Sequence, residues 1–304
     1  MPGRGNDISS RRPLALTGGT GLVGRAVLRA LAQDGRTVRA LHRDTPGPEA
    51  VTWVTGELER PESLRHLVRG AGAVLHLAAA MGVSDPQQLQ RVNVAGTRAL
   101  LNAARAAGVQ RFVYVSSAAA GRETRGPYAD SKRAAEELVR ASGLDWVVLR
   151  PPAVIGPGSQ LETTVLRLAR LGVVPVVGGR GPLHPVHVDD LARLCLEAAD
   201  REGIGGRTYA AGGPDPVSMT GLARAVVRAS PHRALVVPLP GRVALAAARV
   251  LEAVLPRPPL TREAVQGILE GGAGDSGPAR QALGFEPRSL EQALGGRHET
   301  QRGS

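Results

Sequence analysis

Tyr128 and Lys132 stand four residues apart in the segment Tyr128-Ala129-Asp130-Ser131-Lys132. On a helix, residues at this spacing lie on one face, so the phenol and the ammonium would be neighbours. An ammonium beside a phenol favours the phenolate and thereby lowers the pKa of the tyrosine. This pair of residue types predicts that Tyr128 acts as a general acid or base near neutral pH.

Lys132 is the only lysine among the 38 lysine and arginine residues of the chain. A compact ammonium can reach a phenol and ribose hydroxyls together, whereas the forked guanidinium of arginine fits such a position poorly. The use of lysine at this one position favours a chemical role for Tyr128 and Lys132. An ordinary surface pair is the alternative interpretation.

Ser116 and Ser117 follow the apolar run from Arg111 to Val115, which predicts a strand. Ligands of open α/β sheets bind at the carboxyl ends of the strands, where these serines would lie. We expect the Ser117 hydroxyl to hold a substrate carbonyl, with Ser116 as the second choice. The alternative is a serine that only closes the strand end.

Glycines recur at positions 18, 21 and 24, between the apolar run LALT and an amphipathic helical pattern. Gly18 would permit a tight turn, Gly21 would let backbone amides approach a pyrophosphate, and Gly24 would let the helix pack on its strand. The positive end of the helix would then face the phosphates. With a strand before it and a helix after it, this turn predicts a dinucleotide site.

The second predicted strand ends in His42, Arg43 and Asp44, and this end bears on the choice of dinucleotide. NAD sites usually place a carboxylate here, on the ribose hydroxyls. Arg43 could instead clamp the 2′-phosphate of NADP. We therefore expect NADP to be preferred, while an inward turn of Asp44 keeps NAD open as the alternative.

These candidate residues must be positioned by the elements around them. The first half of the chain alternates short apolar runs with helical patterns, in the order LALTGG, GLVGRAVLRALAQDG, TVRALHR, PESLRHLVRG and AVLHLAA. A helix at about 86–108, a strand at 111–117, a helix at about 128–142 and a strand at 145–151 continue the series. This alternation predicts an α/β fold, with a doubly wound parallel sheet of the Rossmann type.

Glycine- and proline-rich segments after Pro151 indicate a second, smaller unit, for which we predict a C-terminal α/β cap. The expected organisation is a disordered basic arm at 1–12, a dinucleotide-binding Rossmann domain at 13–157, a substrate-binding cap at 158–294 and a disordered tail at 295–304. Residues 187–212 are expected to return to the Rossmann sheet. Cap helices are expected at about 218–229, 241–255 and 261–270.

The net charge of +11 could suggest nucleic acid, but the arginines are spread along the whole chain. We therefore expect a small-molecule substrate and no nucleic-acid partner. The single cysteine, Cys195, can form no internal disulfide, which fits a reducing compartment. The chain shows neither an apolar leader nor a run of about 20 apolar residues, so we expect a cytoplasmic protein without an integral membrane segment.

Taken together, these residues resemble the short-chain dehydrogenase/reductase superfamily, specifically its extended and atypical branches, which include the NAD-dependent epimerase/dehydratase family. The resemblance covers nearly the whole chain. Its motifs here are TGGTGLVG at 17–24, GEL at 56–58, VLHLAA at 74–79, VNVAGT at 92–97, YADSK at 128–132, LRPPAVIGPG at 149–158 and VHVDDLA at 186–192.

The resemblance implies that Ser117, Tyr128 and Lys132 occupy the catalytic positions and that Asn93 supports the active site from a helix. It implies hydride exchange with NADP or NAD, while Tyr128 donates or accepts the hydroxyl proton, and it allows a homodimer. The implied cofactor-binding residues are Gly18, Thr20, Gly21, Leu22, Val23, Gly24, His42, Arg43, Glu57, Leu58, Ala78 and Lys132.

The chain departs from the family pattern in three places. Glu57 stands where the family usually has an aspartate near the adenine. Only ten residues separate Ser117 from Tyr128, whereas members that act on sugar nucleotides carry a longer loop there. The tail DSGPARQALGFEPRSLEQAL resembles atypical members related to the Rossmann-type accessory subunit of respiratory complex I, some of which bind the cofactor without turning over a substrate.

Three functions follow from the resemblance and its departures. We favour an NAD(P)-dependent oxidoreductase that acts on a small carbonyl or alcohol group. A nucleotide-sugar epimerase or dehydratase is the second hypothesis, which the short loop opposes. A non-catalytic NAD(P)-binding sensor or assembly protein is the third, which the tail supports.

Two further segments admit more than one interpretation. The spacing of His184, His187 and Asp189 could suit a metal, but we expect none, because the resemblance makes this segment a strand entering a helix capped by Asp189 or Asp190. The run at 242–255 is amphipathic. We expect a cap helix that faces the substrate cleft, and contact with a membrane or a quinone-rich surface is the alternative.

Overall fold

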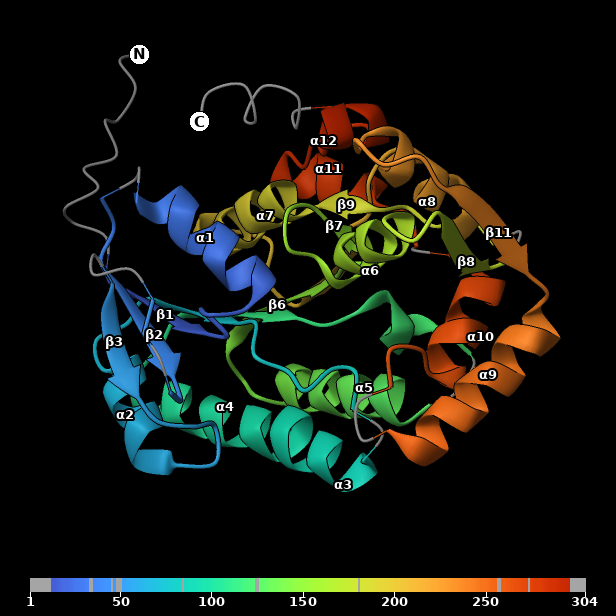
Figure 1. The fold of residues 1–304 in the computed structure, drawn as a ribbon. Helices are drawn as coiled ribbons and strands as arrows, with labels where there is room; N and C mark the ends of the chain where they lie inside the picture. The colour runs from blue at the N-terminus through green and yellow to red at the C-terminus, as the bar shows by residue number, and fades with distance from the viewer. Residues whose placement is uncertain are drawn as a thin grey trace, which may run out of the picture.

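The computed structural model describes residues 12–32, 35–44, 46–47, 51–83, 85–123, 126–179, 181–255, 258–272 and 274–295. The arm expected at 1–12 and the tail expected at 295–304 lie outside these residues, apart from Arg12 and Gly295. In the described part, a large sheet with helices on both faces adjoins a smaller group of helices and strands (Figure 1).

Seven parallel strands form the central sheet, in the order β10-β6-β5-β4-β1-β2-β3. They are β1 (Leu14–Thr17), β2 (Val38–His42), β3 (Thr52–Thr55), β4 (Ala73–His76), β5 (Arg111–Val115), β6 (Asp145–Arg150) and β10 (Arg207–Ala210). Because β1 pairs with both β2 and β4, the strand order reverses beside β1. Open α/β sheets bind their ligands at such a reversal, at the carboxyl ends of the strands. The predicted doubly wound Rossmann-type sheet is confirmed.

Helices cover both faces of this sheet. Those on one face are α1 (Leu22–Ala32) and α7 (Val188–Asp200); those on the other are α2 (Pro61–Val68), α4 (Gly96–Ala106) and α5 (Pro127–Arg140). Successive side chains of a strand point to opposite faces, so Leu14 and Leu16 enter the first core and Ala15 enters the second. Strands buried on both faces need apolar residues throughout, which explains the unbroken apolar runs in the sequence.

The smaller group of elements follows β6 in the sequence. Its members are β7 (Val154–Ile155), α6 (Gln160–Ala169), β8 (Val173–Val177), α8 (Met219–Arg228), β11 (Leu235–Leu239), α9 (Gly241–Val254), α10 (Arg262–Glu270) and α12 (Leu290–Gly295). The helix α11 (Gly277–Leu283) also follows β6 but packs on β10 and α7, in the core of the central sheet. β8 and β11 pair in parallel and share a core with α6 and α8. A separate small core joins α9 to α10. None of the described helices has the length and apolar character needed to cross a bilayer.

One segment of the second half returns to the central sheet. β9 (Val186–His187) pairs with β7, α7 packs along α1, and β10 extends the sheet beside β6. The chain therefore leaves the sheet after β6 and rejoins it at β10. Some cap elements lie between these two strands in the sequence, and the others follow β10.

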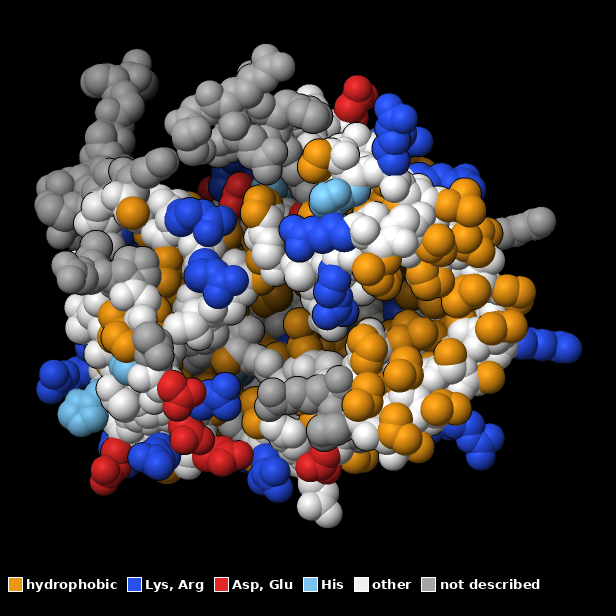
Figure 2. All heavy atoms as spheres, in the orientation of Figure 1, with side chains coloured by type: hydrophobic (Ala, Val, Ile, Leu, Met, Phe, Trp, Pro, Cys, Tyr) orange, Lys and Arg blue, Asp and Glu red, His pale blue; other side chains and the backbone are white. Residues whose placement is uncertain are grey.

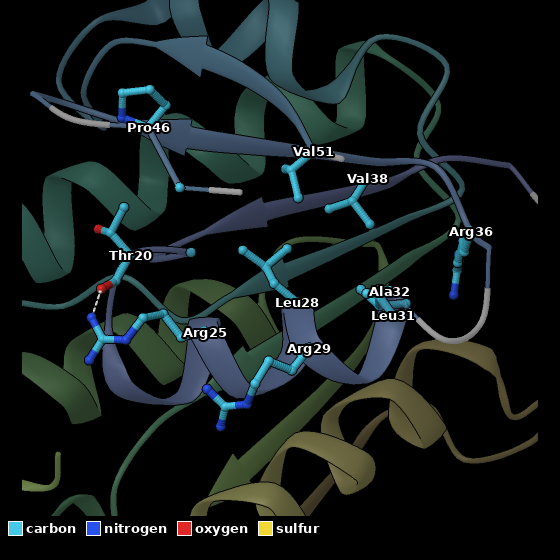
Figure 3. Close-up of a pocket in the computed structure, with 12 residues that line it drawn as sticks. Thr20, Arg25, Leu28, Arg29, Leu31, Ala32, Arg36, Val38, Pro46 and Val51 are labelled. Atoms are coloured by element: carbon cyan, nitrogen blue, oxygen red, sulfur yellow. Dashed lines mark hydrogen bonds between the residues drawn. The ribbon is translucent and has the colours of Figure 1, made fainter. Parts of the chain in front are cut away.

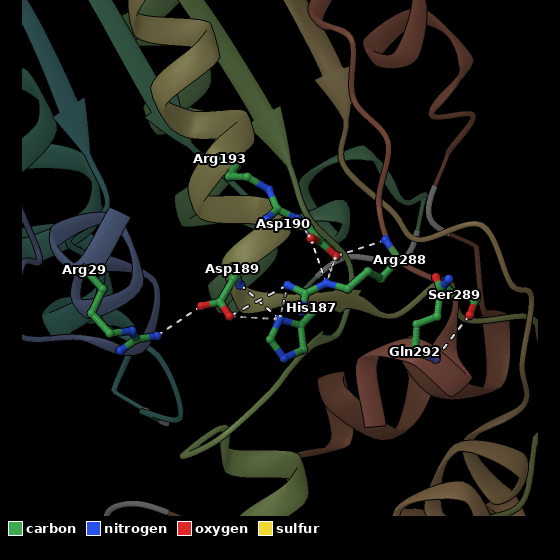
Figure 4. A network of polar contacts seen from close by, with 8 residues as sticks. All are labelled: Arg29, His187, Asp189, Asp190, Arg193, Arg288, Ser289 and Gln292. Carbon is green, nitrogen blue, oxygen red and sulfur yellow. Dashed lines mark hydrogen bonds and ion pairs between the residues drawn. The ribbon is translucent and has the colours of Figure 1, made fainter. Parts of the chain in front are cut away.

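His187 caps the N-terminus of α7, since its Nδ1 accepts a hydrogen bond from the Asp189 amide at 3.2 Å (Figure 4). The expectation that Asp189 or Asp190 caps this helix is wrong. Asp190 is buried and accepts from Nε of Arg288 at 3.0 Å, while Asp189 pairs with Arg29 on α1 at 3.1 Å. These carboxylates tie α7 to α1 and to the C-terminal segment. Within the described ranges, no group of three or more His, Cys, Asp or Glu side chains is arranged to hold a metal ion.

Candidate functional site

The turn between β1 and α1 is so tight that two of its glycines, Gly18 and Gly24, leave no room for a side chain. Gly18 has a φ of +75°, and a Cβ there would lie 2.7 Å from the Ala78 amide nitrogen. A Cβ on Gly24 would lie 2.1 Å from the carbonyl oxygen of Gly18. On Gly21 it would meet only that same oxygen, at 3.2 Å. The turn thus presses against the loop after β4 and stays open above Gly21, where a pyrophosphate would face the N-terminus of α1.

The other predicted cofactor residues flank this turn. Thr20 is exposed and its carbonyl accepts from Arg25, while Leu22 and Val23 are half-buried in the first turn of α1. Leu58 is buried against Gly96, and Glu57 precedes it at the end of the segment after β3. Ala78 lies against Gly18 from the other side. The structure therefore brings these residues to one edge of the sheet.

His42 and Arg43 stand at the end of β2 but differ in exposure. His42 is buried, its Nε2 lies 3.0 Å from the Thr55 hydroxyl, and its ring meets Trp53 edge-on. Its Nδ1 is buried without a hydrogen-bond partner in the described part of the chain. Arg43 is exposed. An orphaned imidazole nitrogen and an open glycine turn fit a polar ligand of dinucleotide size at this edge.

A cavity of about 470 Å³ begins beside this turn, at Gly19, Thr20 and Arg25, and extends between α1, the start of β2 and the segment that precedes β3 (Figure 3). Its walls are mainly apolar, and its basic side chains come from α1 and from Arg36. This cavity lies on the α1 face of the sheet, whereas α5, which carries Tyr128 and Lys132, covers the opposite face.

A buried chain of hydrogen bonds runs beneath the turn. The Thr17 hydroxyl lies 2.7 Å from His76 Nδ1, and His76 Nε2 lies 2.8 Å from the Thr97 hydroxyl. Thr97 donates to the carbonyl of Asn93 at 2.6 Å, so it must accept from Nε2, and Nδ1 must accept from Thr17. Burial, with a smaller effect of Lys132, lowers the pKa of His76 to about 3. A neutral His76 therefore joins the end of β1 to the helix that carries Asn93.

The protonation of His76 predicts how stability depends on pH. Below about pH 6.5 the unfolded chain takes up a proton on His76 that the folded chain excludes until about pH 3. Stability is therefore lost as pH falls through this window, by up to about 5 kcal/mol from this group. Urea unfolding from pH 7 to pH 4 measures the loss. His76→Gln should flatten the dependence of the free energy of unfolding on pH. His66→Gln, on an exposed turn of α2, should leave this dependence unchanged. If the slope persisted in His76→Gln, other groups would be responsible for the loss of stability.

Asn93 lies in a π-helical turn, η2 (Gln90–Ala95), between α3 (Pro86–Leu89) and α4. The single regular helix expected at 86–108 is thus interrupted. Asn93 exchanges two hydrogen bonds with the backbone of Ala80, at 2.7 and 3.2 Å, and donates to the Ser131 hydroxyl at 2.9 Å. Ser131 in turn donates to the carbonyl of Tyr128 at 2.7 Å. Asn93 thus joins the loop after β4 to the first turn of α5. Its support role in the active site stays a prediction.

Tyr128 and Ser117 meet at the carboxyl end of β5. Ser117 begins the short helix η3 (Ala118–Gly121), where its Oγ accepts from the Ala119 amide. Burial raises the pKa of Tyr128 to about 12; a hydrogen bond with Ser117 lowers it, and the carboxylate of Glu263 raises it. The expectation that Lys132 lowers this pKa is wrong, because burial dominates. Tyr128 is therefore a neutral phenol at physiological pH, suited to donate a proton.

Lys132 is almost completely buried, 1% exposed, beneath the end of β5. Its Nζ donates to the Val115 carbonyl at 2.9 Å and lies 4.3 Å from the centre of the Tyr114 ring. Burial lowers the pKa of Lys132 to about 7, against the opposing effect of Glu136. The five donors of a buried guanidinium would need more acceptors than the single carbonyl that Lys132 uses, which gives a physical reason for the only lysine of the chain.

Two carboxylates of the site were not predicted. Glu263 on α10 accepts from the amides of Tyr128 and Ala129, at 3.1 and 2.7 Å, and so caps α5, whose N-cap Gly126 has no side chain to do so. Glu136 is fully buried and accepts from Ser116 at 2.6 Å and from Arg150 at 2.6 and 2.9 Å. The missing N-cap residue was a signal for the first, and the repeat of Tyr128, Lys132 and Glu136 on one helix face was a signal for the second.

Comparison with known proteins bears on the activity of this site. The model of the NAD dependent epimerase/dehydratase family matches residues 14–212. The ceramide reductase of Caulobacter vibrioides is 41% identical over 189 residues, which cover 60% of this chain and 59% of that protein. The 2-alkyl-3-oxoalkanoate reductase of Stenotrophomonas maltophilia is 28% identical over an alignment of 320 residues, covering 92% of this chain and 97% of that protein.

A solved structure extends this comparison to a bound dinucleotide. MoeE5 in complex with UDP-glucuronic acid and NAD is 25% identical, with a TM-score of 0.75, and the match covers 96% of this chain and 99% of that one.

Proposed function

Because this chain belongs to the NAD-dependent epimerase/dehydratase family, we propose that it is an NADP-linked reductase that converts a ketone on an alkyl chain to an alcohol. The observation that carries the proposal is the neutral, partly buried phenol of Tyr128, held by Ser117 at the carboxyl end of β5. A phenol with a pKa of about 12 holds its proton until a developing alkoxide takes it, which suits the reduction of a carbonyl.

The prediction of a nicotinamide-dependent oxidoreductase or epimerase is confirmed. The family match and the reductases among the relatives establish an NAD-linked enzyme of the oxidoreductase or epimerase class. The resemblance to the short-chain dehydrogenase/reductase superfamily is confirmed by the same family match. An enzyme of this class replaces the third hypothesis, a non-catalytic sensor or assembly protein.

A reduced nicotinamide dinucleotide, when bound, supplies the hydride that reduces the carbonyl carbon. Gly18, Gly21 and Gly24 would hold its pyrophosphate, and His42 and Arg43 would face its adenosine end. Tyr128 donates its phenolic proton to the carbonyl oxygen, so that the ketone gains one hydride and one proton. Ser117 orients that oxygen by a hydrogen bond.

The substrate class rests on the names of the relatives. One is a ceramide reductase and another is a 2-alkyl-3-oxoalkanoate reductase, so both are named as reductases of molecules that carry alkyl chains. The short segment between Ser117 and Tyr128 supports such a substrate over a sugar nucleotide. The test is NADPH oxidation with a panel of 3-oxoalkanoates, with UDP-glucose as the competing candidate. Conversion of UDP-glucose without turnover of any ketone would replace this proposal by the epimerase or dehydratase function.

We infer the preference for NADP from Arg43, which is exposed directly after β2. Replacing Arg43 by alanine should weaken NADPH binding by about tenfold to a hundredfold, because a charge-assisted contact to a phosphate is lost. NADH binding should change little. Fluorescence titration of both reduced cofactors gives the two affinities, and Arg65→Ala on α2 is the matched control. Equal affinity of the unmodified protein for NADH and NADPH would contradict the preference.

The homodimer that the resemblance allowed stays a prediction, which sedimentation of the purified chain would test.

A further inference from the structure

Large apolar side chains are exposed on one region of the molecule far more than on any other described part. Seven of the eight exposed large hydrophobic residues belong to α9 and to the edge of β8 and β11; the eighth is Met81. We call these seven the α9 face: Leu171, Val173, Leu235, Val243, Val250, Val254 and Leu255. Figure 2 shows hydrophobic side chains gathered on the right of the molecule, where Figure 1 places α9, β8 and β11.

The helix α9 turns its apolar side outward. Its buried residues are only Ala244 and Ala248, which pack toward α10. Its exposed residues are Val243, Ala246, Ala247, Val250, Ala253 and Val254, together with Arg242 and Arg249. At about 100° per residue, the six apolar positions fall within an arc of roughly 120°, and both arginines lie beside one edge of it. This is the arrangement of a helix that rests in the plane of a membrane surface.

The charge of this region is predominantly positive. Residues 163–188 and 216–251, which contain β8, α8, β11 and most of α6 and α9, include no aspartate or glutamate. Eight arginines occur in these two stretches, and the seven that the structure describes are all exposed: Arg167, Arg170, Arg224, Arg228, Arg233, Arg242 and Arg249. The nearest acidic residue of α9, Glu252, is engaged by Arg262 of α10 at 2.6 Å. An apolar surface with basic side chains around it is complementary to an anionic lipid bilayer.

Packing contacts also join the helix of the α9 face to the active site. α9 packs on α10, and Glu263 of α10 caps α5 directly at Tyr128. The α9 face therefore lies one helix away from the proposed proton donor.

We propose that the α9 face docks on the surface of an anionic lipid bilayer, with the apolar stripe of α9 at the headgroup boundary and its arginines among the phosphates. A second copy of the chain is the less favourable occupant, because two such faces would bring arginines together with no carboxylates between them. The proposal is independent of catalysis, although it agrees with a substrate that carries an alkyl chain.

The test is co-sedimentation of the full chain with vesicles of phosphatidylcholine, with and without phosphatidylglycerol. We expect binding to the anionic vesicles and little binding to the neutral ones. Val250 and Val254 are 62% and 67% exposed, so Val250→Glu with Val254→Glu should leave the fold intact. This double variant should weaken vesicle binding by about tenfold or more. Arg242→Gln with Arg249→Gln should weaken it by roughly fivefold for each arginine.

The matched control is Asn102→Glu with Ala106→Glu on α4, which adds two carboxylates at the same spacing on another exposed helix surface. It should bind anionic vesicles almost as the unmodified chain does. The proposal is overturned if the control and the α9 variant lose binding equally, or if the unmodified chain ignores both kinds of vesicle. It is also overturned if the sole effect of the α9 variant is to convert a dimer to a monomer, because the α9 face would then bind a second copy of the chain. The vesicle assay contains no substrate, so a failure to bind vesicles says nothing about the proposed reductase activity. A protein without reductase activity can likewise still be tested for vesicle binding.

Discussion

Tyr128→Phe is expected to lower kcat/KM for ketone reduction by about a thousandfold, while the affinity for NADPH stays nearly unchanged. The substitution removes one hydroxyl oxygen and keeps the aromatic ring in its partly buried position. That hydroxyl carries the proton for the developing alkoxide and shares a hydrogen bond with Ser117. Steady-state NADPH oxidation and a fluorescence titration separate the two quantities.

Tyr209→Phe is the matched control, since Tyr209 is also buried but lies on β10, where its hydroxyl donates to the Ile204 carbonyl. It should leave kcat/KM close to that of the unmodified chain. If Tyr128→Phe retained full activity, the phenol would not be the proton donor. If both variants lost activity equally, the loss would reflect packing of buried tyrosines and not proton transfer.

Features encoded by neighbouring residues could be predicted from the sequence. The glycine spacing at 18, 21 and 24 depends only on a turn and its two flanking elements, and the structure shows each contact that excludes a side chain. The pairing of Tyr128 with Lys132 is likewise local to one helix. The strand and helix series was predictable because strands buried on both faces carry continuous apolar runs.

Features that depend on distant packing could not be predicted. Glu263 is 135 residues from Tyr128 in the sequence, and only the docking of α10 brings its carboxylate to the end of α5. The pKa of Tyr128 was expected to fall because of Lys132, but burial raises it, and the depth of burial is set by the whole fold. The resemblance implied that Asp189 or Asp190 caps α7, whereas His187 does so, and Asp190 lies in the first turn of the helix, where it accepts from Arg288, a residue 98 positions away.

The same dependence on distant packing explains the stability of the site. His76, Thr17 and Thr97 come from three different elements, and both ring nitrogens of His76 find their partners only when β1, β4 and α4 are assembled. A buried imidazole that cannot accept a proton makes this assembly sensitive to acid. One chain of hydrogen bonds therefore joins the floor of the dinucleotide turn to the backbone of Asn93.

Gly24→Ala should have the largest effect on the dinucleotide site itself. The added Cβ would lie 2.1 Å from the Gly18 carbonyl oxygen and 2.6 Å from the Gly19 Cα, and both are backbone atoms that no rotamer change can move. Either α1 shifts away from β1 or the turn opens, and each change displaces the amides that would bind the pyrophosphate. We expect the free energy of unfolding to fall by about 3 kcal/mol and NADPH affinity to fall by about a hundredfold or more.

Gly21→Ala separates binding from folding, because its Cβ would meet only the Gly18 carbonyl oxygen, at 3.2 Å, on the open side of the turn. This variant should keep most of its stability and still bind NADPH weakly, since the methyl group occupies space that the pyrophosphate needs. Gly295→Ala, where an added Cβ meets no atom within 4 Å, should change neither quantity. Urea unfolding gives the stability of the three variants, and titration with NADPH gives their affinities, so the two measurements rank the variants in both respects. If Gly24→Ala and Gly21→Ala bound NADPH as tightly as Gly295→Ala, the glycine turn would not be the pyrophosphate site, whatever the stability of each variant.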